Sequence, residues 1–77
     1  MSQKQKLIDK LKNAKFADFE DIDLLLRQLG FTVRNAGSHN TYTKAPDYII
    51  GIVRRSGKPV KRVYLENLMD LLERMGI

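Results

Sequence analysis

The feature that most constrains the fold is a change of hydrophobic period at Gly30. Before Gly30, apolar residues recur every three or four positions, at Phe19, Ile22, Leu25, Leu26 and Leu29. That spacing makes one face of a helix. After Gly30, apolar and polar residues alternate over 31–35, which is the pattern of a strand. A glycine that follows a helical pattern commonly ends the helix in the left-handed conformation. We therefore expect a helix that leads directly into a β-sheet.

The same signals divide the rest of the chain. Helices are expected at 2–13, 18–29 and 63–75, and strands at 31–35, 38–44 and 48–54. Turn residues at Ala36-Gly37 and at Ala45-Pro46-Asp47 separate the strands, which predicts an antiparallel sheet. Helices before and after such a sheet pack most economically on one face. The prediction is a single α+β domain over 1–77, in the order α-α-β-β-β-α, with the other face of the three-stranded sheet free.

The first helix leaves two interpretations open. Ser2 and Gln5 have the spacing of a capping box. The apolar stripe that follows is narrow, and consists of Leu7, Ile8, Leu11 and Ala14. A docked helix and a solvated amphipathic arm fit this stripe equally well.

Composition excludes several kinds of site. The chain has 77 residues and no cysteine, which rules out disulfides, thiolate metal sites and cysteine nucleophiles. One histidine and scattered carboxylates do not supply a metal site, so no cofactor is expected. The acidic residues Glu20, Asp21 and Asp23 fall near the start of a predicted helix, where they favour its dipole.

The charge is positive and unevenly distributed. The net charge is +5, and residues 30–62 carry seven lysines and arginines against Asp47, a local net charge of +6. A basic small domain usually meets an acidic partner, most often nucleic acid. No apolar run approaches a membrane span, so we expect a cytoplasmic protein with no membrane partner.

Alternation assigns a side of the sheet to the only histidine. On strand 38–44, Tyr42 is the one large apolar body and should face the helices. His39 then points the other way, toward the free face, as does Arg34 on the preceding strand. A register slip of one residue would reverse this assignment and bury His39.

Histidine in a basic environment suits RNA cleavage. Histidine gains or loses a proton near neutral pH, so it can deprotonate a 2′-hydroxyl or protonate the departing 5′-oxygen. A cationic neighbour stabilises the extra charge on the phosphorane. We therefore take His39 as the candidate catalytic residue, with Gly37 and Ser38 as supporting residues. The candidate RNA-binding residues are Arg34, Lys44, Arg54, Arg55, Lys58 and Lys61. The second acid or base could be a lysine, a tyrosine, water or the substrate.

These residues also resemble a known family. Gly30-Phe31, Arg34, Gly37-Ser38-His39 and Tyr42, followed by 57–61 and a terminal helix, are similar to the HicA family of bacterial toxins. The resemblance covers 16–77 and leaves 1–15 as an additional N-terminal helix. It implies a fold like the double-stranded-RNA-binding domain and a type II toxin–antitoxin mRNA interferase in which His39 is catalytic. It also implies a HicB-type antitoxin that covers the His39 face.

The chain departs from the family at one place. Many members carry a proline and a second histidine near the end of the third strand, where this chain reads Ile52-Val53-Arg54-Arg55-Ser56. The function expected from the sequence is a metal-independent endoribonuclease that cleaves mRNA. A non-catalytic RNA-binding module and a protein-interaction domain are the alternatives.

Overall fold

The computed structural model describes residues 3–55 and 57–77. It contains helices α1 (Gln3–Lys12), α2 (Phe19–Gln28) and α3 (Arg62–Arg74), and strands β1 (Thr32–Ala36), β2 (His39–Lys44) and β3 (Tyr48–Val53). The α-α-β-β-β-α order is as predicted. The end of β2 and the start of β3 fall where they were expected, and every other boundary differs from the expected one by one residue. Ser2, half of the predicted capping box, lies outside the described residues.

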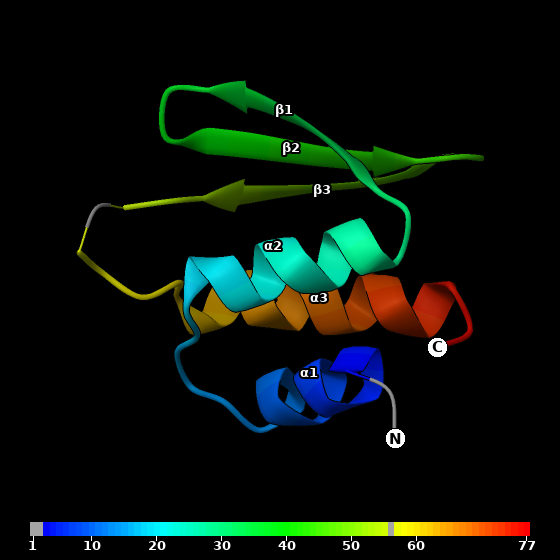
Figure 1. Ribbon diagram of the computed structural model, residues 1–77, viewed down its shortest axis with the longest axis horizontal. Helices are drawn as coiled ribbons and strands as arrows, with labels where there is room; N and C mark the ends of the chain where they lie inside the picture. The colour runs from blue at the N-terminus through cyan, green and yellow to red at the C-terminus, as the bar shows by residue number, and fades with distance from the viewer. Residues whose placement is uncertain (1–2, 56) are drawn as a thin grey trace.

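The helices form two layers on one side of the sheet. The sheet is antiparallel in the order β1-β2-β3. In Figure 1 all three helices lie on the same side of it, with α2 and α3 next to the sheet and α1 beyond them. The predicted α+β fold with helices on one face is confirmed. The opposite face of the sheet is left uncovered by the helices.

The core lies between the sheet and the α2–α3 layer. Tyr42 and Ile52 of the sheet are almost fully buried there, as are Leu25 and Leu26 of α2 and Leu68 of α3. Burial of such side chains is the main favourable contribution to folding. Four of the five apolar positions that periodicity predicted between Phe19 and Leu29 are buried in this core, and Phe19 packs against it half-buried.

Helix α1 is docked, so the alternative of a solvated arm is wrong. Leu11 is only 1% exposed in the core cluster, and Leu7 is also buried. An ion pair of 2.7 Å between Lys10 Nζ and Asp21 Oδ2 joins α1 to α2, and the hydrogen bond in it raises the pKa of Lys10. The narrow apolar stripe is wide enough to dock α1, because α1 packs only on the side of α2 and α3 that is turned away from the sheet.

Gly30 ends α2 as predicted. Its φ angle is 95°, in the left-handed region that glycine adopts without strain. The backbone N–H of Gly30 donates a hydrogen bond to the Arg27 carbonyl, and the N–H of Phe31 donates one to the Leu26 carbonyl. Both have a length of 3.0 Å. This pair of hydrogen bonds is the Schellman motif. It turns the chain directly from α2 into β1.

Candidate functional site

The surface of the sheet that the helices leave uncovered is its outer face. Strand register and alternation assign nine positions to it: Thr32, Arg34, Ala36, His39, Thr41, Thr43, Ile49, Gly51 and Val53. None of these nine positions holds a carboxylate, and their two cationic or titratable side chains are those of Arg34 and His39. The outer face is therefore a small, mostly uncharged surface, with Arg34 in its middle row and His39 in the row at one end.

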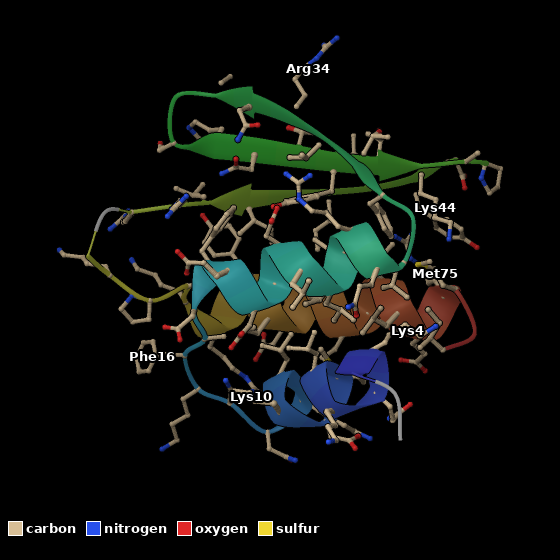
Figure 2. The ribbon with its side chains drawn as sticks, in the orientation of Figure 1. Lys4, Lys10, Phe16, Arg34, Lys44 and Met75 are labelled. Carbon is tan, nitrogen blue, oxygen red and sulfur yellow. The ribbon has the colours of Figure 1, made fainter. Side chains whose placement is uncertain are left out.

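His39 is exposed on this face, as alternation predicted. It is the first residue of β2 and pairs with Ala36 on β1 and with Val53 on β3. Arg34 lies two residues before Ala36, the residue of β1 that pairs with His39, so Arg34 and His39 are diagonal neighbours across the two strands. Diagonal neighbours lie ~7–8 Å apart, which is within reach of a long side chain. Figure 2 shows Arg34 projecting away from the helices. His39 and Arg34 can thus act on one ligand lying on the outer face.

The hairpin that carries His39 closes with a two-residue loop. Ala36 pairs with His39, so Gly37 and Ser38 form the loop, one position later than the Ala36-Gly37 turn expected from the sequence. Gly37 has a φ of 62° and Ser38 has a negative φ, which is the pattern of a type II′ turn. The Ser38 carbonyl accepts a hydrogen bond of 2.8 Å from the backbone N–H of Arg54. The loop is thereby held against the end of β3.

Two asparagines on the inner side of this hairpin were not identified from the sequence. Asn40 is 3% exposed, and its amide donates to the carbonyls of Ser38 at 3.3 Å and Ile52 at 3.4 Å. Asn35, its pairing residue on β1, donates a side-chain hydrogen bond to it. The sequence did contain an indication of their role, because each is a polar residue at an inward position of a strand, where an apolar residue is usual. They hold the loop that precedes His39.

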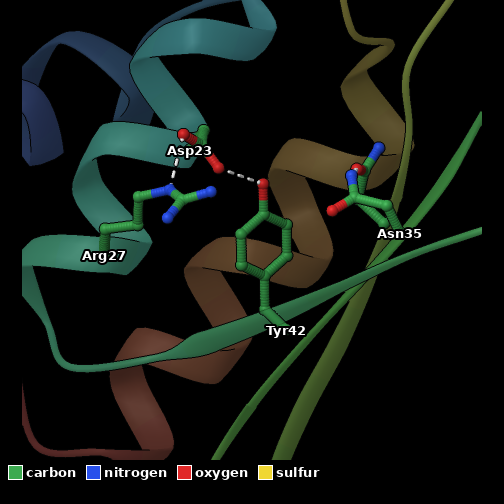
Figure 3. Close-up of polar contacts among 5 residues, drawn as sticks. Asp23, Arg27, Asn35 and Tyr42 are labelled. Carbon is green, nitrogen blue, oxygen red and sulfur yellow. Dashed lines mark hydrogen bonds and ion pairs between the residues drawn. The ribbon is translucent and has the colours of Figure 1, made fainter.

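Tyr42 connects the sheet to α2. Its hydroxyl donates a hydrogen bond of 2.7 Å to Asp23, which also forms an ion pair of 2.9 Å with Arg27 (Figure 3). Burial raises the pKa of Tyr42 above its ordinary value of 10.0, and the hydrogen bond to Asp23 raises it further. Tyr42 points to the inner face of the sheet and His39 to the outer face, so Tyr42 is not placed to act on the same ligand as His39.

A cleft of about 690 Å³ lies at the inner side of the hairpin loop. Its lining comes from the start of α2, from the hairpin and from the loop after β3: Asp18, Phe19, Glu20, Asn35, Gly37, Ser38, Asn40, Arg54, Arg55, Gly57, Lys58 and Pro59. Five of the sequence-predicted site residues meet here, namely Gly37, Ser38, Arg54, Arg55 and Lys58. His39 and Arg34 do not line this cleft.

Three of the predicted RNA-binding cations, Arg54, Lys44 and Lys61, lie in different surroundings. Arg54 forms an ion pair of 3.0 Å with Glu20 and stacks on the Phe19 ring, with 4.9 Å between its guanidinium carbon and the ring centroid. Lys44 is half-buried on the inner face and donates a hydrogen bond to the Leu29 carbonyl. Lys61 is the exposed N-cap residue of α3. The structure does not bring Lys44 or Lys61 to His39.

Two kinds of feature were sought in the described part of the chain, namely clusters of metal ligands and membrane-spanning helices. Within residues 3–55 and 57–77, no cluster of three or more histidine, aspartate or glutamate side chains is placed to bind a metal ion. Over the same residues, no helix combines the length and apolarity that a bilayer span requires.

Comparison of the chain with protein-family models, curated proteins and solved structures gives no significant match. What is established is a small α+β domain with a three-stranded antiparallel sheet.

Proposed function

We propose that this chain is a HicA-type toxin, a metal-independent endoribonuclease that cleaves mRNA with His39 as general acid or base. The observation that carries the proposal is the position of His39. It is exposed on a sheet face that the helices leave uncovered, one diagonal step from Arg34, and no carboxylate occupies that face. The resemblance of 16–77 to the HicA family is the second support.

The chemistry follows from these two side chains. In RNA cleavage, a base removes the 2′-hydroxyl proton, the 2′-oxygen bonds to phosphorus, and the bond to the 5′-oxygen breaks as that oxygen receives a proton. His39 would carry out one of the two proton transfers. Arg34 would stabilise the negative charge that accumulates on the phosphorane oxygens. Absence of carboxylates from the outer face favours approach of a phosphate backbone.

The fold supports an RNA substrate in a more general way. From α2 to α3 the element order is α-β-β-β-α, with both helices on one side of the sheet, which is the arrangement of the double-stranded-RNA-binding domain. The proposed protein partner is a HicB-type antitoxin that covers the outer face and blocks His39. The proposed location is the cytoplasm, where mRNA is available.

A non-catalytic RNA-binding module is the second candidate. The cations Arg54, Arg55 and Lys58 gather at the cleft with Ser38, and His39 does not line that cleft. RNA could therefore bind along the cleft without contact to His39. In that case His39 would be a surface residue with no role in chemistry.

The two candidates differ in what happens to RNA. Purified wild type, His39→Ala and Thr43→Ala are incubated with one RNA, with and without a chelator. Toxin function predicts cleavage by wild type that the chelator does not stop, loss of cleavage in His39→Ala, and unchanged cleavage in Thr43→Ala. Thr43 is the matched control because it is also exposed on the outer face, at the other end of β2. Intact RNA with wild type, together with salt-dependent binding, would support the RNA-binding module instead.

A further inference from the structure

Strand β3 is an edge strand without the usual protection against pairing. Its six residues are Tyr-Ile-Ile-Gly-Ile-Val, with no charge and no proline. Natural edge strands are normally protected by charged residues, proline or bulges, because an open edge pairs with other strands. The opposite edge strand, β1, carries Arg34 and Asn35. The unprotected edge of the sheet is therefore β3.

The backbone of β3 offers hydrogen-bonding groups on its free side. The N–H of Arg54 donates to Ser38 at 2.8 Å, and antiparallel ladders alternate along each strand. Ile52, Ile50 and Tyr48 therefore point their backbone groups at β2, and Ile49, Gly51 and Val53 point theirs outward. Ile49 is 60% exposed, and a Cβ atom added to Gly51 would meet no atom within 4 Å.

Helix α3 places two opposite charges beside this edge. A groove of about 480 Å³ separates β3 from α3, and its lining is Ile49, Ile50, Gly51, Asn67, Asp70, Leu71 and Arg74. Asp70 and Arg74 are exposed and lie one helical turn apart. If a second copy is related to the first by a two-fold axis, its α3 runs in the opposite direction, and its Asp70 and Arg74 follow in the opposite order. Asp70 of each copy can then meet Arg74 of the other.

We propose that the β3 edge binds a second copy of this chain and extends the sheet to six strands. In this arrangement Gly51 lies opposite Gly51 of the second copy, and Ile49 lies opposite Val53. In that register Ile49, Gly51 and Val53 of one copy pair only with the same three residues of the other. These are the residues whose backbone groups point outward, so the two strands can exchange hydrogen bonds. The surface beside the edge is neutral and self-complementary, although the chain has a net charge of +5. This favours an identical chain over a highly charged strand, because a neutral surface gives such a strand no net electrostatic attraction.

The proposal does not depend on the chemistry of His39. A two-fold axis perpendicular to the sheet keeps both outer faces on the same side. The dimer would therefore present two copies of His39 and Arg34 on one continuous surface.

The test is sedimentation velocity of the full chain over a range of concentrations. Wild type should show a concentration-dependent dimer. Ile49→Lys should raise its dissociation constant about tenfold or more, because it puts an unpaired charge opposite Val53 in each half of the interface, and lysine is a residue that protects natural edge strands from pairing. Phe16→Lys is the matched control, since Phe16 is 62% exposed but projects from the loop before α2 (Figure 2). Circular dichroism confirms that each variant is folded.

Charge exchange tests the register. Asp70→Arg and Arg74→Asp should each weaken the dimer, and the double variant should restore it, because the pair is exchanged across the axis. Wild type that stays monomeric at every concentration would overturn the proposal and leave the edge for a strand of a different protein. A dimer that Ile49→Lys leaves unchanged, or that the double charge variant does not restore, would overturn it as well.

Discussion

The hydroxyl of Tyr42 donates a hydrogen bond of 2.7 Å to Oδ1 of Asp23, which joins the middle strand to α2 (Figure 3). This contact fixes which side of β2 faces the helices. With Tyr42 inward, alternation turns His39 outward. A slip of one residue would exchange the two faces, so the same contact protects the exposure of His39.

Tyr42→Phe should lower the free energy of unfolding by ~1.5 kcal/mol, since hydrogen bonds to charged groups contribute ~1.5–3 kcal/mol. The loss should fall at the low end of that range because Asp23 keeps its ion pair of 2.9 Å with Arg27. Urea denaturation followed by circular dichroism measures the change.

Tyr48→Phe is the matched control for this prediction. Tyr48 lies on the neighbouring strand and is half-buried. Removing its hydroxyl should change stability by less than ~0.5 kcal/mol. Equal losses in the two variants would show that the Tyr42–Asp23 hydrogen bond contributes nothing of its own.

Alkaline pH should weaken the contribution of Tyr42 to stability. Burial and the hydrogen bond to Asp23 raise the pKa of Tyr42 in the folded protein above 10.0. Its contribution is therefore complete below about pH 10 and is lost as pH rises further, because only the unfolded chain then releases the proton. The expected loss is ~1.4 kcal/mol per pH unit. Urea denaturation on either side of about pH 10 should show the stability gap between wild type and Tyr42→Phe shrinking. A constant gap would contradict the prediction.

The two glycines of the sheet region should respond in opposite ways to alanine. Gly37→Ala should cost ~1–2 kcal/mol, because φ is 62° and an L-residue is strained there although its Cβ would meet no atom within 4 Å. Gly51 has equally open surroundings and no positive φ. Gly51→Ala should stabilise the protein by ~0.5 kcal/mol. Thermal denaturation distinguishes the two, and a similar change in both would exclude backbone strain at Gly37 as the cause.

Local patterns were sufficient to predict the elements and the faces of the sheet. The period change at Gly30 depends on neighbouring residues alone, and the same is true of the alternation that turned Tyr42 inward and His39 outward. Both were therefore readable from the sequence. Neither required knowledge of how the helices pack.

Contacts between distant elements could not be predicted in this way. Tyr42 and Asp23 are 19 positions apart, and their hydrogen bond depends on how the sheet lies on α2. Lys44 was predicted to bind RNA from its charge, and charge alone does not reveal that its ammonium group reaches the end of α2. Docking of α1 was equally undetermined, since a narrow stripe is stable only where a matching surface exists.

Arg34 and Lys44 should differ in their effect on RNA affinity if the proposed function holds. Arg34→Ala should reduce the slope of log affinity against log salt by ~0.7, the value for one phosphate contact on a single strand. Lys44→Ala should leave the slope unchanged, because Lys44 is half-buried on the inner face and bonded to the Leu29 carbonyl. It should instead lower the free energy of unfolding by ~1 kcal/mol through loss of that hydrogen bond.

Fluorescence anisotropy with a labelled RNA measures these slopes. Both substitutions are made in a His39→Ala background, so that the RNA stays intact during titration. Thr43→Ala removes an uncharged side chain from the outer face and should leave the slope unchanged, although it also removes a hydroxyl that hydrogen-bonds that of Thr32. Equal slopes for Arg34→Ala and its parent would mean that RNA does not lie on the outer face beside His39. A reduced slope for Lys44→Ala, with the protein still folded, would instead indicate that RNA contacts Lys44, at the C-terminal end of β2 on the inner face.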